Sequence, residues 1–62
     1  MSRTMKIVFN GKNIGSIPDN GTNRTEQALD YLEKIGYSSK TIEESTIKII
    51  AKDQVKTILP ND

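Results

Sequence analysis

The dipeptide Asn10-Gly11 determines the fold of the first part of this chain more firmly than any other pair of residues. Asn-Gly is a strong signal for a tight β-hairpin turn, because both residues tolerate the positive φ angles that such a turn requires. Apolar and polar residues alternate on both sides of it. The pattern predicts a hairpin over residues 4–17, with the return strand starting at Lys12.

The alternation also assigns the hairpin side chains to two faces of a sheet. Loops of two or of four residues are both common hairpin connections, and both place the same apolar residues on one face. This predicted core face holds Met5, Ile7, Phe9 and Ile14. The opposite face would then carry Lys6, Val8 and Ile17.

Helical spacing follows, and it predicts a helix over residues 24–35. Asn23 stands before it and Glu26 three residues later, a pattern typical of a capping box. Gly36 stands where helices often close in a left-handed conformation. The apolar residues at helical spacing are Ala28, Leu29, Leu32 and Ile35.

Residues 46–51 are dense in β-branched side chains and predict a third strand. Residues 54–59 would return as a fourth strand with Lys52-Asp53 in the turn, although neither residue favours a positive φ angle. The competing interpretation makes residues 39–59 one long helix, which would give a ribbon-helix-helix. Ile, Thr and Val are poor helix formers, so we favour the two strands.

We therefore expect residues 1–62 to form one small α+β domain of ββαββ order. A single helix would pack on one face of a small antiparallel sheet, with the ribbon-helix-helix as the alternative. Pro60 would end the last strand, and residues 60–62 would form a frayed tail. A chain of this size buries only about 60% of the surface it exposes when unfolded, so a second copy or a partner is a reasonable source of added stability.

The chain has no Cys and no His. Disulfides, thiolate nucleophiles, zinc knuckles and Ser-His sites are therefore excluded. Glu26, Asp30 and Glu33 fall on one side of the predicted helix, but a solvated acidic face is the ordinary explanation. We expect no enzyme activity, no cofactor and no metal site.

Charge is distributed unevenly although the formal net charge is only +1. Residues 1–18 contain three basic residues and no acidic one, whereas residues 19–44 contain three basic and six acidic ones. No apolar run exceeds three residues, and no secretion signal is recognisable, so we expect a cytoplasmic protein with no membrane partner. The abundance of Ile, Lys and Asn is typical of an AT-rich genome, such as that of a bacterium or its phage.

Two surfaces are candidates for binding. The first is an anion site at the helix start, where free N–H groups and the helix dipole attract negative charge; ordinary helix capping explains the same residues. These residues are Thr22, Asn23, Arg24 and Thr25. The second is the sheet face away from the helix, whose exposed apolar residues among lysines are typical of a partner site. Its residues are Lys6, Val8, Ile17, Lys48, Ile50 and Val55.

We expect a small non-enzymatic interaction protein that binds a protein partner, such as a regulator or inhibitor of bacterial or phage type. The alternative is nucleic-acid binding by the basic sheet face or by a ribbon-helix-helix. It is disfavoured because Phe9 is predicted in the core, and Tyr31 and Tyr37 belong to the helix and its cap. Two copies could cover the exposed apolar residues of the sheet by stacking their open faces or by joining edge strands, and we favour such a homodimer over a monomer.

The hairpin at residues 5–17 and the helix after it are similar to the start of the β-grasp sulfur carriers. This resemblance covers about half of the chain. It implies a related sheet topology. Those carriers end in a Gly-Gly tail that is used for activation, whereas this sequence ends Leu59-Pro60-Asn61-Asp62, so no carrier activity is implied.

Overall fold

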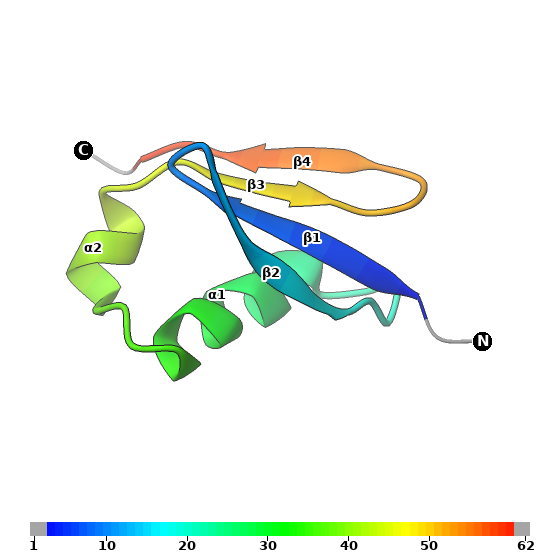
Figure 1. Ribbon diagram of the computed structural model, residues 1–62, viewed down its shortest axis with the longest axis horizontal. Helices are drawn as coiled ribbons and strands as arrows, with labels where there is room; N and C mark the ends of the chain where they lie inside the picture. The colour runs from blue at the N-terminus through cyan, green and yellow to red at the C-terminus, as the bar shows by residue number, and fades with distance from the viewer. Residues whose placement is uncertain (1–2, 61–62) are drawn as a thin grey trace.

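The computed structural model describes residues 3–60, which form four strands and two helices (Figure 1). In chain order these are β1 (Thr4–Phe9), β2 (Lys12–Pro18), α1 (Arg24–Lys34), α2 (Ser39–Glu43), β3 (Ile47–Ile50) and β4 (Val55–Ile58). The expected α+β class is confirmed, and the ββαββ order fits apart from the short helix α2.

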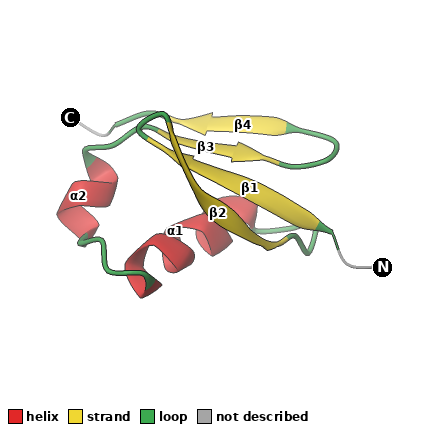
Figure 2. Cartoon of the chain, in the orientation of Figure 1, coloured by secondary structure: helices red, strands yellow, loops and turns green. Residues whose placement is uncertain are grey.

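The strands form one antiparallel sheet in the order β2-β1-β3-β4. Both helices lie on the same side of this sheet, and neither covers the opposite side (Figure 2). The ribbon-helix-helix alternative is wrong, because residues 47–50 and 55–58 are strands. Their β-branched side chains fit a pleated surface better than a helix, where they crowd the preceding turn.

The first hairpin turns where the sequence predicts it. Asn10 and Gly11 have φ angles of 51° and 83°, the positive values that a two-residue hairpin turn needs. Phe9 is opposite Lys12, at the end of the ladder. The turn is also tied to β3, because Asn10 N–H donates to Thr46 O at 2.8 Å and Thr46 N–H donates to Asn10 Oδ1 at 2.9 Å.

A β-bulge interrupts β2 a few residues after this turn. Val8 is opposite Asn13, whereas Ile7 is opposite Gly15, so that Ile14 is an extra residue on β2. Ile14 is half-buried and packs against the core. Gly15 has a φ angle of 148°, a conformation that residues with a side chain rarely adopt.

The bulge corrects one predicted position. Ile17 is opposite Met5 and only 8% exposed, so it belongs to the core and not to the open face. Regular alternation from the turn places it on the wrong side because one inserted residue reverses every later side chain. The prediction for Ile17 was therefore wrong.

Helix α1 has nearly the predicted bounds, but it begins differently. Asn23 adopts a left-handed conformation, with φ 52° and ψ 36°, and its side chain makes no capping hydrogen bond. The predicted capping box is wrong, because an N-cap side chain reaches the first turn from an extended backbone. At the other end, Gly36 has a φ angle of 116° and closes the helix as predicted.

The chain after α1 is held by backbone hydrogen bonds that satisfy the end of the helix. Gly36 N–H donates to Glu33 O and Tyr37 N–H donates to Leu32 O, each at 3.1 Å. This pair of bonds is a Schellman motif. Ser38 then caps α2, since its side chain accepts a hydrogen bond from Thr41 N–H at 3.2 Å.

The core lies between the two helices and one face of the sheet. Leu32 of α1 and Ile7 of β1 have no exposed surface. The rings of Phe9 and Tyr37 have centroids 4.4 Å apart and close the core beside α2. The buried apolar residues are Met5, Ile7, Phe9, Ile17, Ala28, Leu32, Ile42, Ile47, Ile49 and Ala51.

Two further expectations concern the chain as a whole. Leu59 and Pro60 are exposed and lie beyond β4, while residues 61–62 of the predicted tail lie outside the described residues. Neither helix in residues 3–60 has the length and apolar character that crossing a membrane requires.

We predict that Gly15→Ala destabilises the protein by about 1–3 kcal/mol, the usual cost of a strained backbone position. A Cβ atom at Gly15 would lie 2.7 Å from Tyr31 Oη and 3.6 Å from Tyr31 Cζ. In a Tyr31→Phe background only the second contact remains, so the same substitution should cost less there. Urea denaturation of the wild type, the two single variants and the double variant measures both costs, and equal costs would contradict an energetic role for this contact.

Candidate docking surface and the helix start

The side of the sheet opposite the helices is the principal candidate surface, and we call it the open face. Ile17, predicted to belong to it, lies in the core. The other predicted residues, Lys6, Val8, Lys48, Ile50 and Val55, belong to it. The strand registers also place on it Thr4, Asn13, Ser16, Pro18 and Thr57.

Lysine and aliphatic residues alternate at the centre of the open face. Lys6 is directly opposite Ile50, and Val8 is directly opposite Lys48. We call these four residues the checkerboard. Diagonal neighbours on antiparallel strands have their backbones about 7–8 Å apart. Lys6 and Lys48 are therefore close enough for their like charges to repel.

The apolar part of the checkerboard continues onto β4. Ile50 is opposite Val55, which is 59% exposed. Val8 and Ile50 themselves are half-buried, and each has a lysine directly opposite it on the neighbouring strand. The open face therefore offers an aliphatic strip across three strands with an ammonium group on each side of it.

The strands carry charge of one sign only. Lys6, Lys12, Lys48 and Lys56 belong to them, and none of the strand residues is Asp or Glu. Carboxylates are unfavourable in strands, whereas loops and helix ends accommodate them. The acidic residues of the described chain therefore lie in the helices and loops, and the open face has no carboxylate of its own.

The sequence did not reveal which polar residues complete the open face. Ser16 joins Asn13 on this face only because the bulge inserts one extra residue between them. Gly15 is the one available signal, since an isolated Gly in a strand is typical of a bulge. Lys56 is not part of the open face, because it is opposite Ile49 and so faces the helix side.

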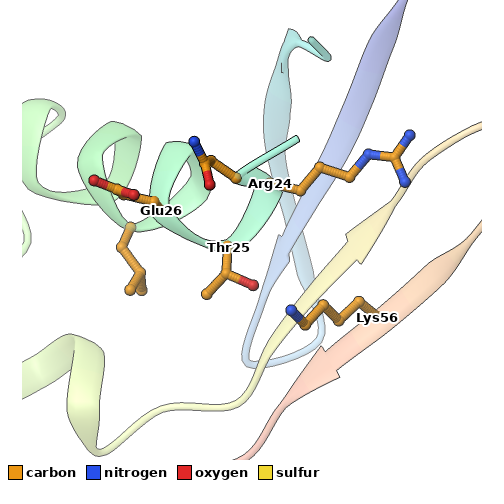
Figure 3. Close-up of a pocket in the computed structure, with 6 residues that line it drawn as sticks. Arg24, Thr25, Glu26 and Lys56 are labelled. Atoms are coloured by element: carbon orange, nitrogen blue, oxygen red, sulfur yellow. The ribbon is translucent and has the colours of Figure 1, made fainter. Parts of the chain in front are cut away.

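The helix start is built around Arg24. Its Nε donates to Asp19 Oδ1 at 2.8 Å, and its second terminal nitrogen donates to Asp19 Oδ2 at 3.0 Å. The same guanidinium bonds Asp53 Oδ1 at 3.0 Å and Gln54 Oε1 at 3.2 Å. In Figure 3 the Arg24 side chain extends away from Thr25 and Glu26. Arg24 thus joins the loop before α1 to the turn between β3 and β4.

Asp19 supplies negative charge at the helix start, where the candidate anion site would take it from a ligand. Its side chain is 1% exposed and accepts a further bond from Gly21 N–H at 2.9 Å. Thr22 N–H donates to Asn20 Oδ1 at 3.0 Å. The Arg24 guanidinium and the amides of Gly21 and Thr22 therefore already bond side chains of this chain and are not free for an external anion.

A shallow pocket of about 460 Å³ lies beside the start of α1. Asn23, Arg24 and Thr25 of the predicted anion site line it, and Thr22 does not. Lys56 reaches toward Thr25 from β4, as Figure 3 shows, and Glu26 lines the same pocket. Because the carboxylate of Glu26 lines the pocket together with Lys56, the pocket does not favour anions over cations.

The acidic side of α1 does not gather its carboxylates into a ligand set. Across residues 3–60 no three side chains of the metal-binding types lie close enough together to hold an ion. Asp30 lines a second pocket of about 320 Å³ together with Ile17, Tyr31 and Lys34. Tyr31 O–H donates to Ile14 O at 3.4 Å across the sheet edge there.

The ion pair at the helix start shifts the acidity of both partners. The hydrogen bond from Arg24, followed by that from Gly21 N–H, lowers the pKa of Asp19 below its ordinary value of 3.8. The hydrogen bond to Asp19 raises the pKa of Arg24 above its ordinary value. Both shifts keep the pair ionised throughout the neutral range.

The chain matches no protein-family model, and no curated protein or solved structure matches it. The resemblance of its first half to the β-grasp sulfur carriers therefore gains no support from these comparisons.

We predict that Asp19→Asn destabilises the protein at neutral pH and that this difference disappears in acid. A carboxylate whose pKa is lowered by folding contributes stability above its unfolded pKa, and the contribution is lost as the pH falls through the lower folded pKa. Urea denaturation from pH 7 down to about pH 2 should show the two curves converging below about pH 4. Asp30→Asn, at an exposed carboxylate of α1, is the matched control, and a comparable convergence there would contradict the assignment.

Proposed function

We propose that this protein is a small non-enzymatic interaction protein whose open face binds an acidic and partly apolar surface of another protein. The checkerboard carries this proposal. Its aliphatic members stay in contact with water in the free protein, and covering them is favourable. Its lysines add a requirement for negative charge in the partner.

Charge supports an acidic partner more specifically. Lys6 and Lys48 are diagonal neighbours, and none of the described residues of the open face carries a carboxylate that would offset their repulsion. A partner carboxylate between them would pair with both ammonium groups at once. Such a pairing raises the rate of encounter and discriminates against basic partners more than it adds affinity.

A nucleic acid is the second candidate, because phosphates would also suit the lysines. Proteins that bind single-stranded nucleic acid typically stack its bases on aromatic side chains. Phe9 and Tyr37 pack on each other in the core, and Tyr31 lies against β2. The open face carries the aliphatic residues Val8, Ile50 and Val55 where stacking would need aromatic rings, so it suits a protein better than bases.

Two observations support a non-enzymatic role. A catalytic acid or base needs a pKa near the working pH, whereas the ion pair moves the pKa of Asp19 away from neutrality. The pocket beside α1 is shallow and open, and its charged residues belong to both signs. A regulator or inhibitor of bacterial or phage type, acting in the cytoplasm, fits this chemistry.

We predict that the protein selects peptides rich in Asp, Glu and apolar residues from a display library of random peptides. Lys6→Glu combined with Lys48→Glu should weaken binding of a selected peptide by at least about tenfold, because two attractive contacts become repulsive. Fluorescence anisotropy of the labelled peptide measures the affinity. Both positions are exposed, so the fold should not change.

The matched control reverses two exposed lysines on the helical side, Lys34 and Lys40. This control changes the net charge equally and should leave the affinity nearly unchanged. A library that yields no binder, or a peptide that binds both double variants alike, would exclude the open face as the docking site. Preferential binding of a single-stranded thymidine oligonucleotide over every selected peptide would favour the second candidate.

A further inference from the structure

The two edges of the sheet differ in how well they can accept another strand. β2, at one edge, contains the bulge and the strained Gly15, and it ends in Pro18. The Tyr31 hydroxyl also donates a hydrogen bond to the carbonyl oxygen of Ile14 in this strand. Bulges and prolines are the usual means by which proteins prevent edge pairing. The β2 edge is therefore protected.

β4, at the other edge, has the opposite character. It pairs with β3 in a regular register and contains no Gly or Pro. Among residues 3–60 the exposed large apolar side chains are Ile35, Val55 and Leu59, and the last two lie in β4 or directly after it. Val55 is 59% exposed and Leu59 is 72% exposed. An edge of this kind favours pairing with another strand.

The hydrogen bonding of the second hairpin shows which backbone groups this edge presents. Ala51 N–H donates to Gln54 O at 2.8 Å, so these two residues form a hydrogen-bonded pair. Hydrogen-bonded and non-bonded pairs alternate along an antiparallel ladder. Lys56 and Ile58 therefore direct their backbone groups toward β3, whereas Val55 and Thr57 direct theirs outward.

We propose that two copies of this chain associate by antiparallel pairing of their β4 strands, with the two-fold axis beside Thr57. In this register Thr57 is opposite Thr57 of the second copy. Val55 is opposite Leu59 of the second copy, and the reciprocal pair forms across the axis. The two most exposed apolar side chains of the described residues then cover each other.

The same register satisfies the backbone. Outward N–H and C=O groups of one strand meet those of the other at Val55, Thr57 and Leu59, as a hydrogen-bonded ladder requires. Centring the pair on Lys56 would instead set two lysines directly opposite each other, which is destabilising. Either neighbouring register also separates Val55 from Leu59. The strand is thus self-complementary in one register.

Pairing at this edge would join two four-stranded sheets into one continuous sheet, with the helices of both copies on the same side. The two open faces would become neighbours within one surface. Short strands bury little area, and interfaces below about 1,200 Å² are generally weak. The dimer should therefore form at high protein concentration and dissociate on dilution.

Sedimentation equilibrium over about 10 µM to 1 mM, the range expected for a weak interface, tests this inference. The average mass of the wild type should rise from 6.9 kDa toward twice that value. Thr57→Pro should hold the mass at 6.9 kDa, because it removes an outward N–H without removing a bond to β3. Amide exchange at Val55 and Thr57 should slow as the wild-type concentration rises.

Two further variants keep the test decisive if Thr57→Pro fails to fold. Val55→Lys combined with Leu59→Lys should also abolish association, while Ile35→Lys, at the third exposed apolar residue, should leave it unchanged. A wild-type mass fixed at 6.9 kDa overturns the inference. Association that survives the paired lysine substitutions also overturns it. Neither outcome depends on peptide binding, so the docking proposal is tested separately.

Discussion

Because both helices lie on the same side, this four-stranded sheet buries only one of its faces, and the rest of the structure follows from that limit. Burial of apolar side chains is the main favourable contribution to folding, so the strands direct their large aliphatic residues toward α1 and α2. Every strand then has a second face in water. Lysine occupies part of that face, since its long stem covers neighbouring aliphatic groups while its charge remains hydrated. The result is a sheet that is apolar on one side and basic with aliphatic gaps on the other.

Because the core is thin, polar contacts are important for holding the loops in place. Arg24 makes several of these contacts at once. Lys52-Asp53 forms the second hairpin turn although neither residue has the positive φ angle of a favoured two-residue turn. Arg24 bonds Asp53 and Gln54 and also holds Asp19, so a contact from the helix start compensates for weak local turn chemistry. The carboxylates of Asp19 and Asp53 also neutralise the guanidinium charge that an anion at the helix start would need.

The open face and the β4 edge are separate features that meet at one strand. Val55 is part of both, because its side chain belongs to the open face while its backbone lies at the free edge. Pairing of two β4 strands would leave Lys6 and Lys48 of each copy free for a partner, since these residues belong to β1 and β3. A dimer would thus present two checkerboards side by side, and an extended acidic partner could engage both with a gain from bivalency.

Local sequence determined the elements of this protein. The Asn10-Gly11 turn, the helical spacing before Gly36 and the β-branched residues after position 46 each act over short distances, so the ββαββ order and most of the open face followed from the sequence. The bulge was decided by tertiary structure, because Gly15 adopts its strained conformation where Tyr31 crosses the edge of β2. As a consequence, the side chain of Ile17 lies on the core face instead of the open face. The role of Arg24 was decided in the same way, since its partners Asp53 and Gln54 are about thirty residues distant in the chain. Turns and periodicity depend on neighbouring residues, whereas an inserted strand residue or a long-range ion pair depends on segments that meet only in the folded chain.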